Sequence, residues 1–130
     1  MDSTAIIAEQ YAATARGDVP GMLRALAPDI RWTEAAGSLY AGTFVGPEAV
    51  LANVFGPIAE QWDGFAAEVE SLLDAGDHVV ALGYYSGTHR RTGRRFRARM
   101  VHIWRVADGL AVEFEQVVDS ALMNAAALDD

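Results

Sequence analysis

The sequence predicts a single α+β domain in which helices near the start of the chain cover a strongly curved antiparallel sheet. Three observations predict this class. Apolar residues recur at helical spacing in the first half, and after Gly64 the apolar period changes to two. Three turn signals then divide residues 65–119 into four β segments of a meander. The 130 residues, 1–130, have the length of one domain and can bury a full core.

Three segments of the first half have helical signals. Residues 2–17 carry apolar positions at helical spacing behind candidate capping residues, and a glycine ends the run. Residues 19–29 predict a second short helix that ends at Pro28. A third helix is expected over 46–62, with a kink or break at the Gly-Pro pair 56–57.

The remaining segments predict strands. Residues 30–34 alternate as a short strand, and the glycine-rich stretch 35–46 is a loop with room for one more short strand. The turns of the meander are expected at 74–77, 90–93 and 107–109. The C-terminal residues predict a short helix or a tail.

Alternation assigns the faces of the last two long strands. Arginines mark the outer face of the third long strand, so the opposite set faces inward: Ala98, Met100, His102, Trp104 and Val106. In the fourth long strand the inward set is Val112, Phe114, Gln116 and Val118. Glu113 and Glu115 then face outward near the arginines, where cross-strand ion pairs are expected.

The composition excludes several classes of chemistry. The chain has no cysteine and no lysine, which excludes disulfides, thiolate catalysis and Schiff-base chemistry. The net charge of −8 argues against nucleic acid as a partner. No apolar run approaches the roughly 20 residues of a membrane span, and the N-terminus lacks a signal-peptide pattern. We therefore expect a cytoplasmic protein that does not contact a membrane.

The histidines and arginines show no ligand or nucleic-acid motif. The three histidines lack metal-ligand spacing, so no metal and no other cofactor is expected. His78 and His89 lie at or near turns and are interpreted as solvated. The arginine-rich run 90–99 is interpreted as a solvated hairpin tip, open to pairing with acidic residues of a second subunit.

Three polar residues share the inward side with aromatic residues. His102 is either a core histidine bonded to a neighbour or a working group whose charge a nearby carboxylate would tune. Glu34 is either a strand-end carboxylate or, in an apolar pocket, a base with a raised pKa. Tyr11 either packs or donates a hydrogen bond. The expected wall of a pocket for a small hydrophobic molecule comprises Trp32, Tyr40, Phe55, Trp62, Tyr85, Met100, Trp104, Phe114 and Gln116.

Four stretches carry a family resemblance. They are "AEQYAATARGDVPGMLRALAPDIRWTE", "GPEAV", "GDHVVALGYYSGTHRRTGRRF" and "HIWRVADGLAVEFEQVVD". Together they resemble the SnoaL-like branch of the nuclear transport factor two-like superfamily, which also contains ketosteroid isomerase, scytalone dehydratase and limonene epoxide hydrolase. The resemblance implies a cystatin-like α+β barrel, a cone of curved sheet closed by N-terminal helices. The same fold hosts many reactions and many binding proteins.

The resemblance also implies roles for single residues. Tyr11 is similar to the tyrosine of ketosteroid isomerase that donates a hydrogen bond to the developing oxyanion. Glu34 falls at the position of its proton-abstracting aspartate, and His102 at that of its protonated aspartic acid. Gln116 stands where the polyketide cyclases have their acid/base aspartate, and an amide cannot take that proton. Asp119 matches a family position near the cavity mouth and is a fourth catalytic candidate.

Three functional hypotheses remain open at this point. The first is a cofactor-independent enzyme of the isomerase, cyclase or dehydratase type that moves a proton on a small hydrophobic carbonyl compound, polyketide- or steroid-like. The second is a non-catalytic binding protein of the same fold. The third is epoxide hydrolysis or ether-ring formation, which requires Asp119 to reach Glu34. Because Val101 and Ile103 make the outer sheet face half apolar, we also expect a homodimer.

Overall fold

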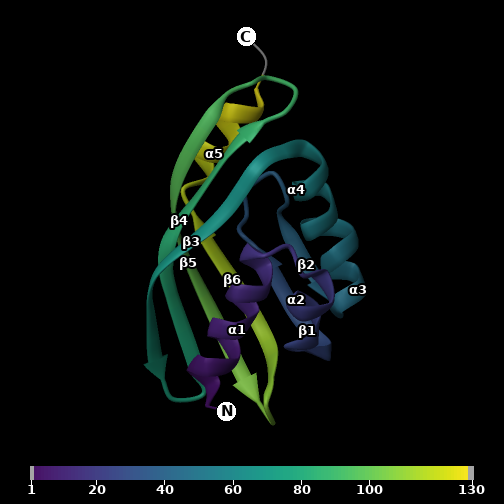
Figure 1. Ribbon diagram of the computed structural model, residues 1–130, viewed down its shortest axis with the longest axis vertical. Coiled ribbons are helices and arrows are strands. Elements are labelled where there is room, and N and C mark those ends of the chain that lie inside the picture. The colour runs from purple at the N-terminus through teal and green to yellow at the C-terminus, as the bar shows by residue number, and fades with distance from the viewer. Residues whose placement is uncertain (1, 129–130) are drawn as a thin grey trace.

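The computed structural model describes residues 2–128 and confirms the α+β class (Figure 1). Two helices open the chain. A helical segment separates the first two strands from the last four, and a further helix follows the last strand. The helices are α1 Ser3–Ala15, α2 Val19–Arg24, α3 Pro47–Val50, the π-helix η1 Leu51–Phe55, α4 Gly56–Gln61 and α5 Ser120–Ala127. The strands are β1 Leu26–Glu34, β2 Gly42–Val45, β3 Trp62–Ala75, β4 His78–His89, β5 Arg95–Ala107 and β6 Leu110–Val118.

The six strands form one sheet in the order β2-β1-β6-β5-β4-β3. The meander β3–β6 is antiparallel throughout, as predicted. The pair β1–β6 is parallel, so the prediction of a purely antiparallel sheet was wrong for that pair. These two strands are far apart in the chain, and no hairpin forces them to run in opposite directions. Since β2 and β3 do not pair, the sheet is curved but not closed into a barrel.

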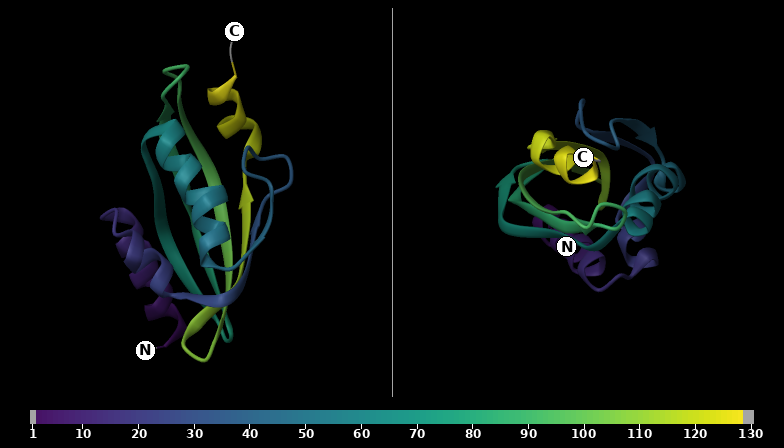
Figure 2. Two further views of the ribbon diagram at one scale, coloured as in Figure 1. Left: turned by 90° about the vertical axis from the view of Figure 1, so that its right-hand side faces the viewer. Right: turned by 90° about the horizontal axis from the view of Figure 1, so that it is seen from above.

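The helices cover the concave side of this sheet. Figure 2 shows the strands curling around one side of the interior, while α1, α2 and the helical segment 47–61 lie on the other. The segment 47–61 stays helical throughout, so the chain does not break at 56–57, and the irregularity in the helix is the π-helix η1 directly before this pair. The Gly56 amide bonds to the carbonyl of Leu51, five residues back, and this wider π turn accommodates Pro57, which has no amide proton.

Two other boundaries differ from the sequence prediction. The second helix ends at Arg24 rather than at Pro28, which instead lies inside β1. The ladder between β1 and β6 is interrupted between Leu26 and Arg31, so a residue without an amide proton is tolerated there. The other segments match: β2 forms within the loop 35–46, and α5 is the predicted C-terminal helix.

A β-bulge changes the inward face at the start of β6. The register pairs Arg105 with Glu113 but Val106 with Ala111, which leaves Val112 as the extra residue. Ala111 is therefore buried and Val112 half-buried, the reverse of the predicted alternation. The rest of the strand follows the prediction.

The hairpin between β4 and β5 contacts its own chain. Arg90 pairs with Asp63 at 2.8 Å and Arg99 with Glu70 at 2.9 Å. The hydroxyl of Thr92 donates to the Ala126 carbonyl at the end of α5. Arg91 and Arg94 also donate to carbonyls at this end of the helix. The arginine run therefore ties the sheet to the last helix.

His89 was predicted to be solvated, and the structure shows that it is buried. Its ring lies edge-on to Trp62 with a centroid distance of 4.8 Å, and its Nδ1 accepts the amide proton of Arg91. The residue is the last of β4, on the inner face of the sheet beneath the hairpin. Its proximity to a turn in the sequence did not reveal this burial.

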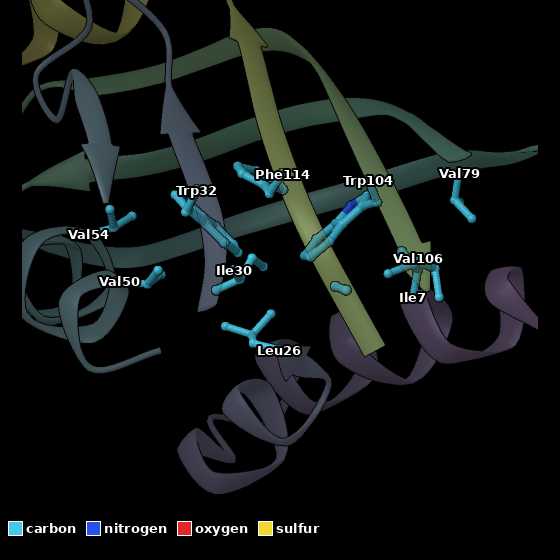
Figure 3. Close-up of a cluster of buried hydrophobic side chains, with 11 residues drawn as sticks. Ile7, Leu26, Ile30, Trp32, Val50, Val54, Val79, Trp104, Val106 and Phe114 are labelled. Atoms are coloured by element: carbon cyan, nitrogen blue, oxygen red, sulfur yellow. The ribbon is translucent and has the colours of Figure 1, made fainter. Parts of the chain in front are cut away.

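The core contains two groups of buried apolar side chains. The first centres on Trp32, Trp104 and Phe114, whose side chains lie on one side of three neighbouring strands (Figure 3). Trp32 stacks on Phe114 with a centroid distance of 3.7 Å. The second group lies towards α5 and includes Trp62 and Met100. No helix within residues 2–128 is long and apolar enough to cross a membrane.

Gly83→Ala tests the close approach of β3 and β4. A Cβ at Gly83 would lie 2.1 Å from the Glu68 carbonyl oxygen, beside a shift in the register of β3. The atoms that this Cβ would meet belong to the backbone of β3 and cannot turn aside as a side chain could. We therefore expect the variant to lose about 2 kcal/mol of the free energy of unfolding, measured by urea denaturation. Gly87→Ala is the control, since its nearest contact is 3.3 Å, and it should lose clearly less. Equal stability of the two variants would contradict the prediction.

Candidate active site

A cavity of about 430 Å³ lies between the concave face of the sheet and the helices. Most of its wall is apolar or aromatic, which suits a small hydrophobic ligand. The residues that line it are Gln10, Tyr11, Thr14, Gly17, Val19, Met22, Trp32, Glu34, Val54, Phe55, Ile58, Ala59, Trp62, Gly64, Phe65, Ala67, Tyr85, His102, Trp104 and Phe114. Within the described residues, no group of three or more His, Asp and Glu side chains could hold a metal ion.

The structure brings most of the predicted site residues to this cavity. Nine of them line it: Tyr11, Trp32, Glu34, Phe55, Trp62, Tyr85, His102, Trp104 and Phe114. Met100 is buried in the second core group. The Tyr40 hydroxyl donates to Gln61 and accepts from the Trp62 indole, outside the cavity wall.

Asp119 is not part of the cavity wall. It is exposed and caps α5, with its carboxylate accepting the Leu122 amide proton at 3.3 Å. An Asp that precedes a helix commonly satisfies a free amide in this way. The structure therefore does not bring Asp119 together with Glu34 in one cavity.

The other eleven wall residues were missed from the sequence, among them Gln10 and Phe65. Gln10 is buried and lies on the face of α1 that also carries Ile7 and Thr14. The spacing of these three residues marks one helical face and could have revealed it. Phe65 lies near the start of β3, and the sequence pattern did not show which face of this strand points inward.

The side chain of His102 lies between two tyrosine hydroxyls. Its Nδ1 is 2.5 Å from the Tyr11 Oη, and its Nε2 is 2.5 Å from the Tyr85 Oη. The Trp104 indole donates to the Tyr11 oxygen, and the Gln116 amide donates to the Tyr85 oxygen, each at 2.9 Å. These five side chains form one hydrogen-bonded chain that joins α1 to β4, β5 and β6.

Burial lowers the pKa of His102 to about 3, so the imidazole is neutral near neutral pH. Both of its ring nitrogens are occupied by tyrosines and neither bonds to Glu34. The ring is therefore poorly placed to take a proton from a ligand. Its neutral form holds the two tyrosines in place.

Glu34 is the acidic group of the cavity. The residue is only 3 % exposed, and its Oε2 has no hydrogen-bond partner among the described residues. Burial raises the pKa of Glu34 to about 7, and the neighbouring Trp32 indole opposes the rise. The Trp32 Nε1 also lacks a partner in this part of the chain. A carboxylate with one unpartnered oxygen and a pKa near neutrality is a suitable general base.

Gln116 stands behind the cavity wall. Its Oε1 accepts the Ala35 amide proton at 3.1 Å, while its amide group donates to Tyr85. It pairs with His102 across β5 and β6, which places it next to the imidazole. It supports the site without lining it.

Comparison with known proteins shows the family to which the fold belongs. The SnoaL-like domain matches residues 7–114 of the chain. The chain belongs to the SnoaL-like domain family. This fold family includes isomerases and cyclases. A search of the curated proteins finds no match to this chain.

Solved structures with the same fold cover nearly the whole chain. An NTF2-like protein from Burkholderia thailandensis is 44% identical, with a TM-score of 0.94 and 97% of each chain covered. An NTF2-like protein of unknown function from Burkholderia pseudomallei is 32% identical, with a TM-score of 0.88 and coverage of 97% of this chain and 98% of that one. TerC, co-crystallised with polyporic acid, is 24% identical with a TM-score of 0.85 and shares the fold over 94% of this chain and 95% of its own.

The raised pKa of Glu34 predicts a loss of stability as the pH rises. Between its ordinary value of 4.5 and the folded value of about 7, the folded protein keeps a proton that the unfolded chain has released. The free energy of unfolding should therefore fall over this range, by up to about 3 kcal/mol from this group. Urea denaturation at pH 5 and pH 8 measures the change.

In Glu34→Gln, the free energy of unfolding should lack the part of its pH dependence that comes from Glu34. The variant should therefore be more stable than the wild type at pH 8. Glu48→Gln removes an exposed carboxylate from α3 and is the matched control, which should keep the dependence of the wild type. The same pH slope in wild type and Glu34→Gln would show that Glu34 titrates normally.

Proposed function

We propose that this protein is a cofactor-independent enzyme of the isomerase or cyclase type, which transfers a proton on a small hydrophobic carbonyl compound, polyketide- or steroid-like. The observation that carries the proposal is Glu34, a buried carboxylate whose Oε2 has no hydrogen-bond partner among the described residues and whose pKa is raised to about 7. It shares the cavity with the Tyr11 hydroxyl, which is held by His102 and Trp104. A base and a hydrogen-bond donor in one apolar cavity are what enolate chemistry requires.

The first step breaks a C–H bond next to the carbonyl group. Ionised Glu34 takes the proton, and the electron pair of the C–H bond passes into an enolate. The negative charge that develops on the carbonyl oxygen is stabilised by the proton of Tyr11, because a preorganised donor in an apolar cavity is effective at this point. The proton on Glu34 then returns to another carbon in an isomerase. In a cyclase, the enolate carbon instead attacks a second carbonyl of the same molecule, the π electrons of that carbonyl pass to its oxygen, and the resulting alkoxide takes the proton back from Glu34.

The wall favours an uncharged substrate. Among residues 2–128, Glu34 is the only acidic residue that lines the cavity and no arginine lines it, while His102 is neutral. An anionic ligand would meet a buried carboxylate with no opposing cation, at a high electrostatic cost. The aromatic side chains of Trp32, Phe65 and Phe114 offer apolar surface to a ligand of cyclic or polyketide type.

A non-catalytic binding protein is the second candidate, and the mainly apolar wall favours it. A binding protein would hold a ketone without exchanging its protons, so the exchange assay below separates the two functions. Epoxide hydrolysis through a pair of carboxylates is not proposed, because Asp119 caps α5 and does not line the cavity.

Glu34→Gln tests the base. We expect the wild type to catalyse exchange of the α-protons of 2-tetralone in D₂O, followed by NMR, with kcat/KM rising with pH to a plateau around an apparent pKa of about 7. The variant should lose at least about 100-fold in kcat, because an amide takes no proton. Binding of the ketone, measured by quenching of the cavity tryptophans, should change only a few-fold.

Glu48→Gln serves as the control for this assay as well, since Glu48 is exposed on α3. Wild-type exchange in Glu34→Gln would remove Glu34 as the base. Binding of 2-tetralone without any exchange by the wild type would favour the binding protein.

Tyr11→Phe tests the hydrogen-bond donor. Loss of a donor to the developing oxyanion should lower kcat about 100-fold, with a smaller effect on KM, since the charge on oxygen grows only in the transition state. Tyr84→Phe is the matched control, because Tyr84 lies on the outer face of β4 under Arg97. Equal kcat in Tyr11→Phe and Tyr84→Phe would show that Tyr11 only packs.

A further inference from the structure

The hydrogen bonds around His102 limit where the protons of the imidazole and of the two tyrosine hydroxyls can lie. A neutral imidazole has one N–H donor and one nitrogen acceptor. Each ring nitrogen lies 2.5 Å from a tyrosine oxygen. One tyrosine therefore accepts a proton from the ring, and the other donates its own proton to the ring. The tyrosine that accepts keeps its hydroxyl proton for another partner.

The outer partners of both tyrosines have fixed directions. The Trp104 indole can only donate, so the Tyr11 oxygen accepts from it. The Ala35 backbone amide can only donate, so it bonds to the Oε1 of Gln116 and turns the Nε2 of Gln116 towards Tyr85. Each tyrosine oxygen therefore already accepts one hydrogen bond. The direction of the hydroxyl proton of each tyrosine is what remains to be assigned.

Two arrangements satisfy these bonds. With the proton on Nδ1, Tyr85 donates to Nε2 and the proton of Tyr11 is free to enter the cavity. With the proton on Nε2, Tyr11 donates to Nδ1 and the proton of Tyr85 is free. The two arrangements differ in which hydroxyl must find a further acceptor.

Burial favours the first arrangement. Tyr85 is only 6 % exposed, and no hydrogen bond in the described residues gives its proton an acceptor other than the ring. Glu34 is near enough for its charge to act on Tyr85, yet no hydrogen bond joins the two. Both tyrosines line the cavity, but Tyr11 is half-buried, so a ligand or solvent reaches its hydroxyl more readily than that of Tyr85. Leaving a donor unsatisfied costs more at the buried site.

We propose that Gln116 and Tyr85 are positioning residues that hold neutral His102 as its Nδ1–H tautomer and thereby make Tyr11 the hydroxyl that donates its proton to a ligand oxygen. The role of that donor in catalysis rests on the proposed function, whereas the tautomer does not. In this arrangement the Tyr11 oxygen accepts from both His102 and Trp104. Two donors to one hydroxyl oxygen strengthen the bond that its own proton makes. The site then recognises a ligand oxygen that accepts, such as that of a ketone or an enolate.

The tautomer can be read directly by NMR. Two-bond ¹H–¹⁵N correlations of uniformly ¹⁵N-labelled protein distinguish a protonated from a bare ring nitrogen. The chain has three histidines, and the variants His78→Asn and His89→Asn assign the other two by loss of their signals. At pH 7.5 we expect His102 to have a protonated Nδ1 and a bare Nε2. A protonated Nε2, or protons on both nitrogens, would overturn the proposal.

Gln116→Glu should reverse the tautomer. At pH 8.5 the new carboxylate can accept from the Ala35 amide and also from the Tyr85 hydroxyl. The Tyr85 oxygen would then accept from Nε2–H, and Tyr11 would donate to Nδ1 and lose its free proton. Gln61→Glu is the matched control, because Gln61 also contacts a tyrosine hydroxyl, that of Tyr40, at 2.6 Å. A Nδ1–H signal that persists in folded Gln116→Glu contradicts the positioning role.

Kinetics give a second readout. On the high-pH plateau of the 2-tetralone assay, Gln116→Glu should lose about 100-fold in kcat, as expected for a missing oxyanion donor. Adding Tyr11→Phe to this variant should cost less than about 3-fold, because the donor is already lost. A further 100-fold loss would overturn the coupling. A Nδ1–H tautomer in a wild type that exchanges no proton would leave the positioning role in place and refute the proposed function.

Discussion

The cavity depends on the burial of one uncharged imidazole. His102 lies on the inner face of β5 with both ring nitrogens bonded to tyrosine hydroxyls, so it enters an apolar interior without a charge or an unsatisfied polar atom. One of these hydroxyls comes from α1 and the other from β4. The contact that docks the first helix on the sheet is therefore also the contact that orders the polar end of the cavity. Losing the ring would remove one hydrogen-bond partner from a tyrosine hydroxyl on each of two elements at once.

Glu34 contrasts with this satisfied chain. Its carboxylate lies at the end of β1 and is as buried as the imidazole, but one oxygen has no partner among the described residues. Burial without a cation raises its pKa, which costs folding free energy once the group ionises. A fold optimised only for stability would pair or replace such a group. The cavity thus combines a rigid hydrogen-bond donor with a carboxylate that is free to accept a proton, and the proposed chemistry uses this difference.

The alternation of residue types predicted much of the site correctly. The arginines of β5 identified its outer face, and His102, Trp104 and Met100 are buried opposite them, as expected. The same reasoning failed at Val112, where one extra residue shifts the pattern. The prediction that His89 is solvated failed for a different reason. It rested on nearness to a turn, which does not show whether a hairpin folds back on the core. A bulge and a packed hairpin are set by the register of neighbouring strands, which the local sequence does not encode.

The sequence by itself determined the α+β class, the family, and the placing of Tyr11, Glu34 and His102 on the inner side of one fold. The class and the inward faces follow from periodicity and residue type, which are local properties of the chain, and the family follows from the resemblance of four stretches of its sequence. Only the tertiary structure decided that both nitrogens of His102 bond to tyrosines, that Gln116 supports Tyr85 from behind, and that Asp119 caps α5 instead of lining the cavity. The physical reason is distance along the chain. Tyr11 and His102 are 91 residues apart, and their hydrogen bond exists only because helix docking and sheet curvature bring the two side chains together.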